Sequence, residues 1–301
     1  MNEQNLLRGI SENGGVVFYG VDSTDIVREM ERLHKTSAVT TAALGRLLTA
    51  AAMMGAMLKG GRDTVTLQVN GGGPAGRLLA VADGSGHVKG YVQHPVVELP
   101  PRADGHLDVG GAVGKGGTLD VIRDLGLREP YIGQVPLVSG EIAEDVTRYF
   151  AISEQTPTVC ALGVLVNADL SVQCAGGFIV QLLPGATEEE ITQLEKNIAA
   201  MPAVTALLAQ GKSVRDMLDM ALDGFAPDVL DTSAAVYRCD CSEERVQRML
   251  RSLGRKEVER LRDEDPRAEV DCQFCDKVYH VDLNELLAGW PENAPGGAAQ
   301  V

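Results

Sequence analysis

Positive charge is scarce in this sequence of 301 residues. Lysine and arginine together number 27, against 42 aspartates and glutamates, which leaves a formal net charge of −15. Contacts to phosphate groups need clustered basic side chains. The charge balance therefore argues against a nucleic-acid-binding protein and against docking on an anionic membrane, and it favours solubility.

The sequence also lacks a secretory leader and an uninterrupted apolar run. Met1–Arg8 does not have the charged-then-apolar pattern of a signal peptide. The most apolar stretch, residues 38–58, is interrupted by Thr40, Arg46 and Thr49, which favours a buried helix over a membrane span. Six cysteines are too few for a disulfide-dense secreted scaffold in a chain of this length. We expect a cytoplasmic protein whose thiols are normally reduced.

Four of the six cysteines form two close pairs in the last quarter of the chain. Cys239 and Cys241 are separated by one residue, and Cys272 and Cys275 by two. Side chains at positions i and i+2 of an extended segment point to the same side, and a C-x-x-C turn also brings its two sulfurs together. Four convergent thiolates suit one tetrahedral Zn²⁺ ion. The spacing therefore predicts a zinc site with these four ligands, and His280 is interpreted as a surface strand residue.

The same spacing allows a second chemistry. Either pair could close on itself as a local disulfide, and the small C-x-C ring should be strained and easily reduced. Structural zinc contributes about 10–16 kcal/mol to the folding of a small module. Oxidation that ejects the ion should therefore unfold the segment. Spacing alone leaves two interpretations open, an inert structural zinc site and a redox-sensitive switch.

The remainder of the chain predicts an α+β fold. Helices are expected at about 22–34, 37–58 and 139–153, and Met53, Met54 and Met57 of the second helix are interpreted as core residues. Cys160 and Cys174 are interpreted as small buried hydrophobic residues of a long hairpin. Predicted strands lie at 15–21, 64–70, 77–82, 87–92, 118–123, 131–135, 158–166 and 171–183.

After Pro184 and Gly185 the pattern changes to short amphipathic helices. Thr187 begins a capping box, and Pro202 and Ser213 separate the pieces that follow, as far as about residue 231. Short helices are marginal alone and need a surface on which to bury their apolar side chains. The segment is either a stable layer over the sheet or a metastable cover, and the sequence does not separate the two.

Two segments partly match nucleotide-binding motifs but lack residues or structure that those motifs require. Gly71-Gly-Gly73-Pro-Ala-Gly76 satisfies G-x-G-x-x-G, but the next residues read as a strand, whereas a dinucleotide site needs a helix there. Gly114-Lys-Gly116 lacks the Ser or Thr that follows the lysine of a phosphate loop, and Val109 stands where that motif needs a glycine. We expect the first motif to be a hairpin turn, and we expect no ATP site.

Several longer segments carry a resemblance to a known family. They are Thr41-Ala-Ala-Leu-Gly-Arg-Leu-Leu-Thr49, Gly114-Lys-Gly-Gly-Thr118, Gln134-Val-Pro-Leu-Val-Ser-Gly-Glu-Ile-Ala-Glu144, Gly176-Gly-Phe178 and Gln181-Leu-Leu-Pro-Gly185. Together with the two cysteine pairs, they resemble the redox-regulated heat-shock chaperones of thirty-three kilodaltons, ATP-independent holdases of the bacterial cytosol. The resemblance covers nearly the whole chain and favours the switch over the inert zinc site.

The resemblance implies a mechanism and a domain organisation. Oxidative stress would release one Zn²⁺ and form the disulfides Cys239–Cys241 and Cys272–Cys275, and the loosened protein would bind unfolding client proteins. The reduced protein would be a monomer and the oxidised protein a homodimer, without enzymatic turnover. The expected domains are an α+β core domain (1–185), a metastable helical linker (186–231), a zinc-binding redox-switch domain (232–290) and a disordered tail (291–301).

Two functions of other classes stay open beside this one. The first is a zinc-dependent adaptor that binds one folded partner in any redox state. The second is a thiol oxidoreductase, but neither cysteine pair lies in the βαβ context of a thioredoxin-like site.

Overall fold

The structure is a computed structural model that describes residues 4–290. Its internal contacts divide the chain into two compact units, with the boundary between Arg238 and Cys239. The predicted tail, 291–301, lies outside the described residues.

The first unit contains eleven of the strands and seven of the helices of the described chain. In chain order these are β1 (Leu6–Ser11), β2 (Val16–Asp22), α1 (Thr24–His34), α2 (Ala38–Ala56), β3 (Thr64–Asn70), β4 (Leu78–Asp83), β5 (His87–Val92), α3 (Val109–Val113), β6 (Thr118–Asp124), β7 (Tyr131–Pro136), α4 (Ala143–Ser153), β8 (Thr158–Val166), β9 (Val172–Leu182), α5 (Glu188–Ala200), α6 (Val204–Ala209), α7 (Val214–Ala221), β10 (Pro227–Ser233) and β11 (Val236–Tyr237).

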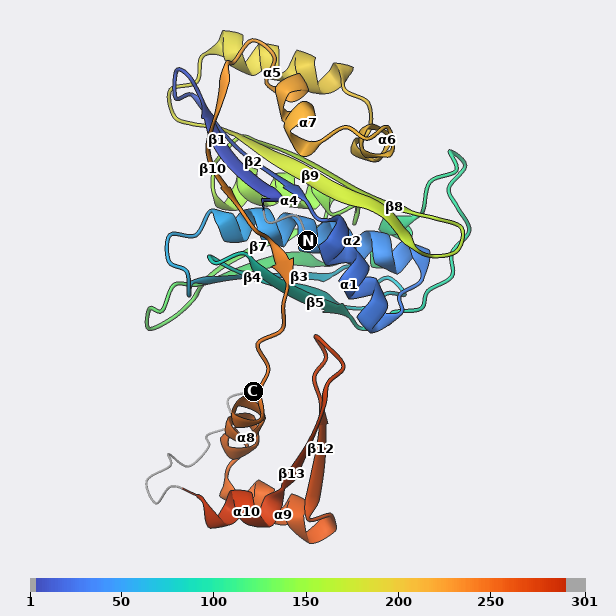
Figure 1. The fold of residues 1–301 in the computed structure, drawn as a ribbon, viewed down its shortest axis with the longest axis vertical. Coiled ribbons are helices and arrows are strands. Elements are labelled where there is room, and N and C mark those ends of the chain that lie inside the picture. Colours follow the sequence, from blue (N-terminus) through green and yellow to red (C-terminus); the bar gives the residue numbers. More distant parts are fainter. Residues whose placement is uncertain (1–3, 291–301) are drawn as a thin grey trace. The chain divides into compact units, whose positions relative to one another are not determined.

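These elements form layers around two sheets. A five-stranded sheet has the order β10-β1-β2-β9-β8, and a six-stranded sheet has the order β11-β5-β4-β3-β6-β7. Helices α1, α2 and α4 lie between the sheets, and α5, α6 and α7 cover the opposite face of the five-stranded sheet (Figure 1). The α+β fold predicted from the sequence is confirmed.

Helix α2 is the centre of the larger core. Nearly all of its side chains are buried, including Leu44, Leu47 and Met53. Its many alanines allow neighbouring elements to approach closely on every side. By length and composition this helix could cross a membrane, but 89% of the qualifying window is buried inside the protein. The interpretation of α2 as a core helix, with Met53 and Met54 in the core, is therefore confirmed.

The five-stranded sheet is buried on both faces, which explains its long apolar strands. Side chains along β2 alternate between two clusters: Tyr19 and Val21 face the core around α2, whereas Val16 and Phe18 face α5, α6 and α7. Gly163 of β8 provides space for the second layer. A Cβ at Gly163 would lie 2.9 Å from Cγ1 of Val204 in α6, so only glycine permits this close approach.

Two of the motifs that carried the family resemblance meet in space. Arg46 of α2 forms an ion pair with Glu141, with Nη1 2.6 Å from Oε2. Asp145, fully buried at the start of α4, accepts backbone N–H groups from Val138 at 2.7 Å and from Ile142 at 3.1 Å. The charged residues of these motifs therefore fix the loop that precedes α4 against the core helix.

The glycine-rich motif at residues 71–76 connects β3 to β4, which pair in antiparallel fashion. No helix follows it, so its interpretation as a hairpin turn is confirmed.

Four short elements were not expected from the sequence. They are β1, α3, β10 and β11. Strand β10 begins with Pro227 and contains Asp228 and Asp231, residues that disfavour strands, yet it pairs with β1 along its length. The helical linker expected up to residue 231 therefore ends in a strand.

The boundary between the two units also differs from the expected one. Residues 236–237 form β11, which pairs in parallel with β5, so the segment after residue 231 belongs to the first unit. Tyr237 reinforces this pairing because its hydroxyl donates to the carbonyl of Gly90 at 2.9 Å. The second unit therefore begins at the first cysteine of the cluster.

The second unit is small. It contains α8 (Glu243–Ser252), α9 (Arg255–Glu264), β12 (Arg267–Asp271), β13 (Val278–Asp282) and α10 (Leu283–Ala288). Strands β12 and β13 form an antiparallel hairpin, in which Val270 lies opposite Tyr279. A compact cluster of eight buried side chains joins the helices to the hairpin: Val246, Leu250, Val258, Tyr279, Val281, Leu283, Leu286 and Leu287.

Candidate metal centre

The first cysteine pair lies in an extended segment just before α8. Ser242 begins the helix, and its side chain accepts the backbone N–H of Arg245 at 3.3 Å. The capped helix fixes where the segment ends and so orients Cys239 and Cys241. The Arg245 side chain donates to Asp240, which lies between the two cysteines. It bonds the carboxylate of Asp240 and, at 3.1 Å, the Asp240 backbone carbonyl.

The second pair occupies the turn between β12 and β13. The N–H groups of Cys275 and Asp276 donate to the carbonyl of Cys272 at 3.2 and 2.8 Å. Asp276 has a φ of 55°, in the left-handed region that asparagine and aspartate tolerate better than most residues. The N–H of Cys272 closes the turn onto the carbonyl of Lys277 at 3.0 Å. This tight turn directs both sulfurs of the pair to one side.

The four sulfurs of the two pairs converge. All lie within 4.8 Å of one another; Sγ of Cys239 is 3.6 Å from Sγ of Cys272, and Sγ of Cys241 is 3.4 Å from Sγ of Cys275. A disulfide needs about 2.05 Å, so these are free thiols. Zinc–sulfur bonds of about 2.3 Å place tetrahedral ligands about 3.8 Å apart, close to the observed separations. The four cysteines therefore form a group that could hold one metal ion.

The electrostatic environments of these thiols differ. Burial raises the pKa of Cys239, and it raises the pKa of Cys275 to about 11. Burial also acts to raise the pKa of Cys241, but hydrogen bonds from Tyr279 and the neighbouring thiols outweigh it and lower that pKa to about 7. Of these three sulfurs, Cys241 is therefore the one most readily present as a thiolate, the form that binds metals and attacks oxidants.

Tyr279 was not identified from the sequence as part of the site. Its hydroxyl donates to Sγ of Cys241 at 3.0 Å, and this hydrogen bond raises the pKa of the phenol. The ring is buried in the cluster of the second unit, with Lys277 4.8 Å above it. The strand pattern of β13 predicts an inward side chain at position 279, but it does not predict which sulfur the hydroxyl meets.

Three basic residues close to the cysteine pairs in the sequence have other partners. Arg245 is bound to Asp240, and Lys277 lies over the Tyr279 ring. Arg238 belongs to the first unit and contacts His87, with 3.1 Å between Nη1 and Nε2. Hydrogen bonds to Cys241, rather than neighbouring charges, lower the pKa of this thiol.

The other candidates lie outside the site. His280 is exposed on β13, with Nδ1 3.5 Å from a carboxylate oxygen of Glu269, as expected for a surface strand residue. Cys160 and Cys174 lie on β8 and β9, and they are half-buried rather than buried as predicted. Each stands opposite a different residue of the hairpin, Ile179 and Leu165, so the two thiols are not neighbours. Burial raises the pKa of both, which makes them poor nucleophiles.

The metal site is continuous with the small core. Cys241 and Cys272, one from each pair, pack against the cluster of buried side chains in the second unit. A bound ion would therefore connect the segment before α8, the turn of the β12–β13 hairpin and the cluster between them. Domains below about 70–80 residues rarely gain enough stability from burial alone and commonly rely on such a cross-link.

Comparison with known proteins identifies the family. The model of the Hsp33 protein family matches residues 4–282. A 33 kDa chaperonin of Clostridioides difficile is 51% identical over 94% of this chain and 97% of its own length. A 33 kDa chaperonin of Clostridium tetani is 43% identical, with 94% of this chain and 97% of that protein covered.

A solved structure agrees with these relatives. The crystal structure of the 33 kDa chaperonin (heat shock protein 33 homolog) of Thermotoga maritima matches with a TM-score of 0.86 and 38% identity, over 95% of this chain and 98% of that one. The resemblance noted in the sequence is confirmed: the chain belongs to the Hsp33 family of chaperones.

Proposed function

We propose that this protein is a redox-regulated, ATP-independent holdase of the cytoplasm. The observation that carries the proposal is the convergence of four free cysteine sulfurs within 4.8 Å in a unit with a small core. Because the chain belongs to a chaperone family, we expect its ligands to be client proteins. The net charge of −15 supports the expectation that neither nucleic acid nor an anionic membrane is a partner.

In the reduced protein, Cys239, Cys241, Cys272 and Cys275 would hold one Zn²⁺ as thiolates. Soft thiolate ligands in tetrahedral array select zinc over the harder cations that prefer oxygen. Bound zinc would supply a cross-link that contributes about 10–16 kcal/mol to the folding of the second unit. The hydrogen bond from Tyr279 would hold Cys241 in the ligating form.

Oxidation would convert each pair to a disulfide. The Cys241 thiolate attacks one oxygen of hydrogen peroxide, the O–O bond breaks, and the products are a sulfenic acid and hydroxide. The thiolate of Cys239 then attacks the Cys241 sulfur and expels a second hydroxide. Two protons convert the hydroxides to water. Cys272 and Cys275 undergo the same two-electron reaction with a second peroxide, and the disulfide-bonded sulfurs no longer ligate the metal.

Loss of the cross-link would unfold the second unit and loosen the cover formed by α5, α6 and α7. The cover is thin: in α5 only Leu194 is buried, and α6 has six residues. Removing it would expose Phe18, Phe178 and the other apolar residues of the five-stranded sheet that face the cover. This surface would capture unfolding clients. The proposed active form is a homodimer and the reduced form a monomer.

The test combines thiol counting, metal content and chaperone activity on the full chain. Reduced protein should contain one zinc per chain and four metal-protected thiols. Peroxide at elevated temperature should abolish both and, at the same time, induce suppression of client aggregation. Cys174→Ser, outside the cluster, is the matched control and should behave as wild type. Zinc loss without any gain in aggregation suppression would falsify the switch.

A constitutive zinc-dependent adaptor is the second candidate function. Four sulfurs within 4.8 Å of one another are also the geometry of a permanent structural zinc site, and this observation supports it. The two candidates differ in the effect of Cys272→Ser. An adaptor should lose partner binding permanently, whereas a holdase should become constitutively able to bind clients.

A further inference from the structure

A pocket of about 450 Å³ opens at the C-terminal end of α2. Strands of both sheets of the first unit contribute to its walls, together with the ends of α2 and α4. Its volume lies within the range of small-molecule sites, about 300–1,000 Å³. Every lining residue precedes residue 182, so neither the cover nor the second unit forms part of it. The pocket is therefore separate from the proposed switch.

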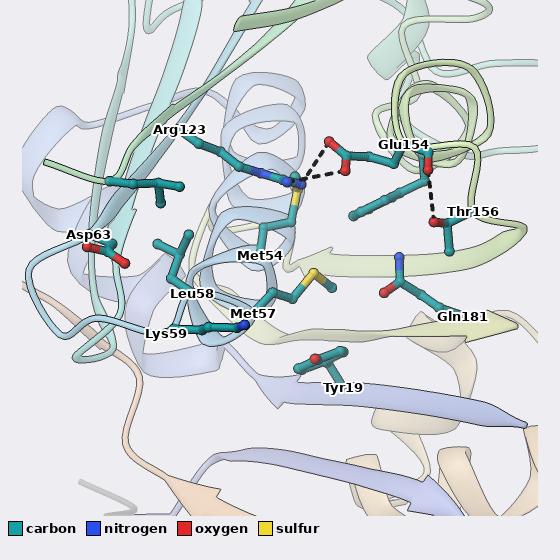
Figure 2. Close-up of a pocket in the computed structure, with 12 residues that line it drawn as sticks. Tyr19, Met54, Met57, Leu58, Lys59, Asp63, Arg123, Glu154, Thr156 and Gln181 are labelled. Atoms are coloured by element: carbon teal, nitrogen blue, oxygen red, sulfur yellow. Dashed lines mark hydrogen bonds and ion pairs between the residues drawn. The ribbon is translucent and has the colours of Figure 1, made fainter. Parts of the chain in front are cut away.

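The apolar wall of the pocket is adaptable in shape. Met54, Met57 and Leu58 line it from the end of α2, and Phe150 lines it from α4. Figure 2 shows the two methionine side chains directed into the pocket. Methionine adapts to apolar groups of different shape, and its sulfur packs favourably against aromatic rings. This wall therefore suits the apolar body of a small ligand, an aromatic one included.

Tyr19 of β2 brings a polar group to this wall. The side chain is only 8% exposed, and its hydroxyl makes no hydrogen bond within residues 4–290. Burial raises the pKa of the phenol, so the group is a neutral hydrogen-bond donor at pH 7. Buried polar groups are nearly always hydrogen-bonded. The free hydroxyl therefore points to a partner that enters the pocket.

Lys59 supplies a second donor at the mouth of the pocket. It is exposed, and it forms no ion pair among the residues that the structure describes. Figure 2 shows its ammonium group directed toward Met57, with Tyr19 on the same side of that methionine. Two of the last carbonyls of α2 already accept the N–H groups of residues 57 and 58, at 3.3 and 3.0 Å. The ammonium group is therefore not needed to cap these carbonyls.

The two acidic side chains of the lining already have partners. Glu154 and Arg123 bond in bidentate fashion at 3.1 and 3.2 Å, as the dashed lines in Figure 2 show. Asp63 accepts the backbone N–H three residues before it at 2.9 Å. The donors left for a ligand are therefore Lys59 and Tyr19. An anionic oxygen group suits both, because hydrogen bonds to a charged acceptor are about twice as strong as neutral ones.

We infer that this pocket binds a small amphipathic carboxylate. The apolar body of the ligand packs against Met54, Met57 and Phe150. Its carboxylate accepts hydrogen bonds from the Lys59 ammonium group and the Tyr19 hydroxyl. A cationic ligand would be repelled by the lysine, and a neutral one would lack the charge-assisted bonds. This site goes beyond the proposed function, since it requires neither the metal nor a client protein.

The probe is 2-naphthoate, and 2-naphthamide is its neutral analogue of the same shape. Binding of each to the reduced full-length protein is measured by equilibrium dialysis at neutral pH. The carboxylate should bind at least about tenfold more tightly than the amide, because the carboxylate alone forms charge-assisted hydrogen bonds. Equal affinity for the two compounds overturns the assignment of a carboxylate site.

Variants identify the two donors. Lys59→Met removes the charge, keeps an apolar side chain, and should weaken naphthoate binding about tenfold while changing naphthamide binding less than about twofold. Tyr19→Phe removes the hydroxyl alone and should weaken naphthoate binding about threefold. The matched control is Lys196→Met, at an exposed lysine of α5 outside the pocket, which should change affinity less than about twofold. Circular dichroism verifies the fold. Equal losses in Lys59→Met and Lys196→Met overturn the site.

Methyl-labelled methionine locates the ligand in the wild-type protein, so the test does not depend on the stability of a variant. The methyl resonances of Met54 and Met57 should shift when 2-naphthoate is added. Met249, 48% exposed in the second unit, is the control for nonspecific binding to exposed apolar side chains and should not shift. A shift of Met249 without shifts of Met54 and Met57 overturns the pocket as the binding site. Failure of the redox switch would leave this result unchanged, because the ligand is added to the reduced protein.

Discussion

The two units of this protein are stabilised in different ways. The first unit buries α2 between two sheets and gains its stability from a large apolar core. The second unit buries eight side chains and places four sulfurs beside them. Burial does not depend on the redox state of the surroundings, whereas thiolate ligation does. In the proposed switch, a redox signal would therefore unfold the second unit while the core of the first unit stays folded.

The largest expected effect follows from removing the metal. Chelation, or Cys272→Ser, should unfold the second unit, because it loses about 10–16 kcal/mol of folding free energy. The only tryptophan, Trp290, packs against the core of this unit and reports its unfolding by fluorescence. Circular dichroism should show that most secondary structure is retained. A second unit that keeps its native Trp290 emission without metal would remove the distinction between the units.

A cavity in the larger core should have the opposite effect: it should destabilise the first unit and leave the second unit folded. Leu47→Ala removes a fully buried side chain of α2 and should destabilise the first unit by about 2–5 kcal/mol in urea unfolding. Zinc content and Trp290 fluorescence under native conditions should stay as in wild type. If zinc content fell with the stability of the first unit, the two units would be one cooperative structure.

A smaller effect is expected at the contact between the sheet and its cover. In Gly163→Ala, the new methyl group would lie 2.9 Å from Val204 Cγ1 and 3.0 Å from the Thr205 nitrogen. Such overpacking costs about 1–3 kcal/mol. Amide exchange of α6 should therefore accelerate while zinc stays bound. Gly185→Ala is the control, because nothing lies within 4 Å of its added Cβ. Equal exchange in both variants would show that α6 does not depend on the close approach.

The smallest effect concerns Tyr279. Its hydrogen bond helps to lower the pKa of Cys241 to about 7, below the ordinary thiol value, so the thiolate is present above this pH and is lost as pH falls through it. Metal affinity should fall in the same direction, and Tyr279→Phe should shift the loss to higher pH. Removing such an outer-shell partner typically costs about tenfold or more in affinity. Chelator competition between pH 8 and pH 5 measures both effects, and an unchanged midpoint would contradict them.

Sequence patterns predicted much of this fold because they are local. Alternating and helical spacing located nearly all the long elements, and the composition of residues 38–56 identified the core helix. The clearest miss is β10, whose residues lack local strand preference. β10 carries proline and aspartate and exists because β1 offers it a partner 216 residues or more earlier in the chain, as in the pairing of Ser11 with Pro227.

The candidate site also combines features that the sequence predicted with contacts that it did not predict. Cysteine spacing predicted that these four thiols converge, because each pair is brought together by local backbone geometry. Tyr279 was missed because its contact with Cys241 spans 38 residues of sequence. Basic residues lie close to the pairs in the sequence, but only the structure shows that their side chains contact Asp240, His87 and the Tyr279 ring.

By itself, the sequence determined the group of four converging cysteines, the buried helix and the family, since each depends on residue types at short spacing or on long matched segments. Only the tertiary structure brought Cys239 within 3.6 Å of Cys272 and Cys241 within 3.4 Å of Cys275, and only it decided which strands form the edges of each sheet. The physical reason is that these contacts join residues far apart in the chain. Their partners are selected by packing of the whole unit, which no local pattern encodes.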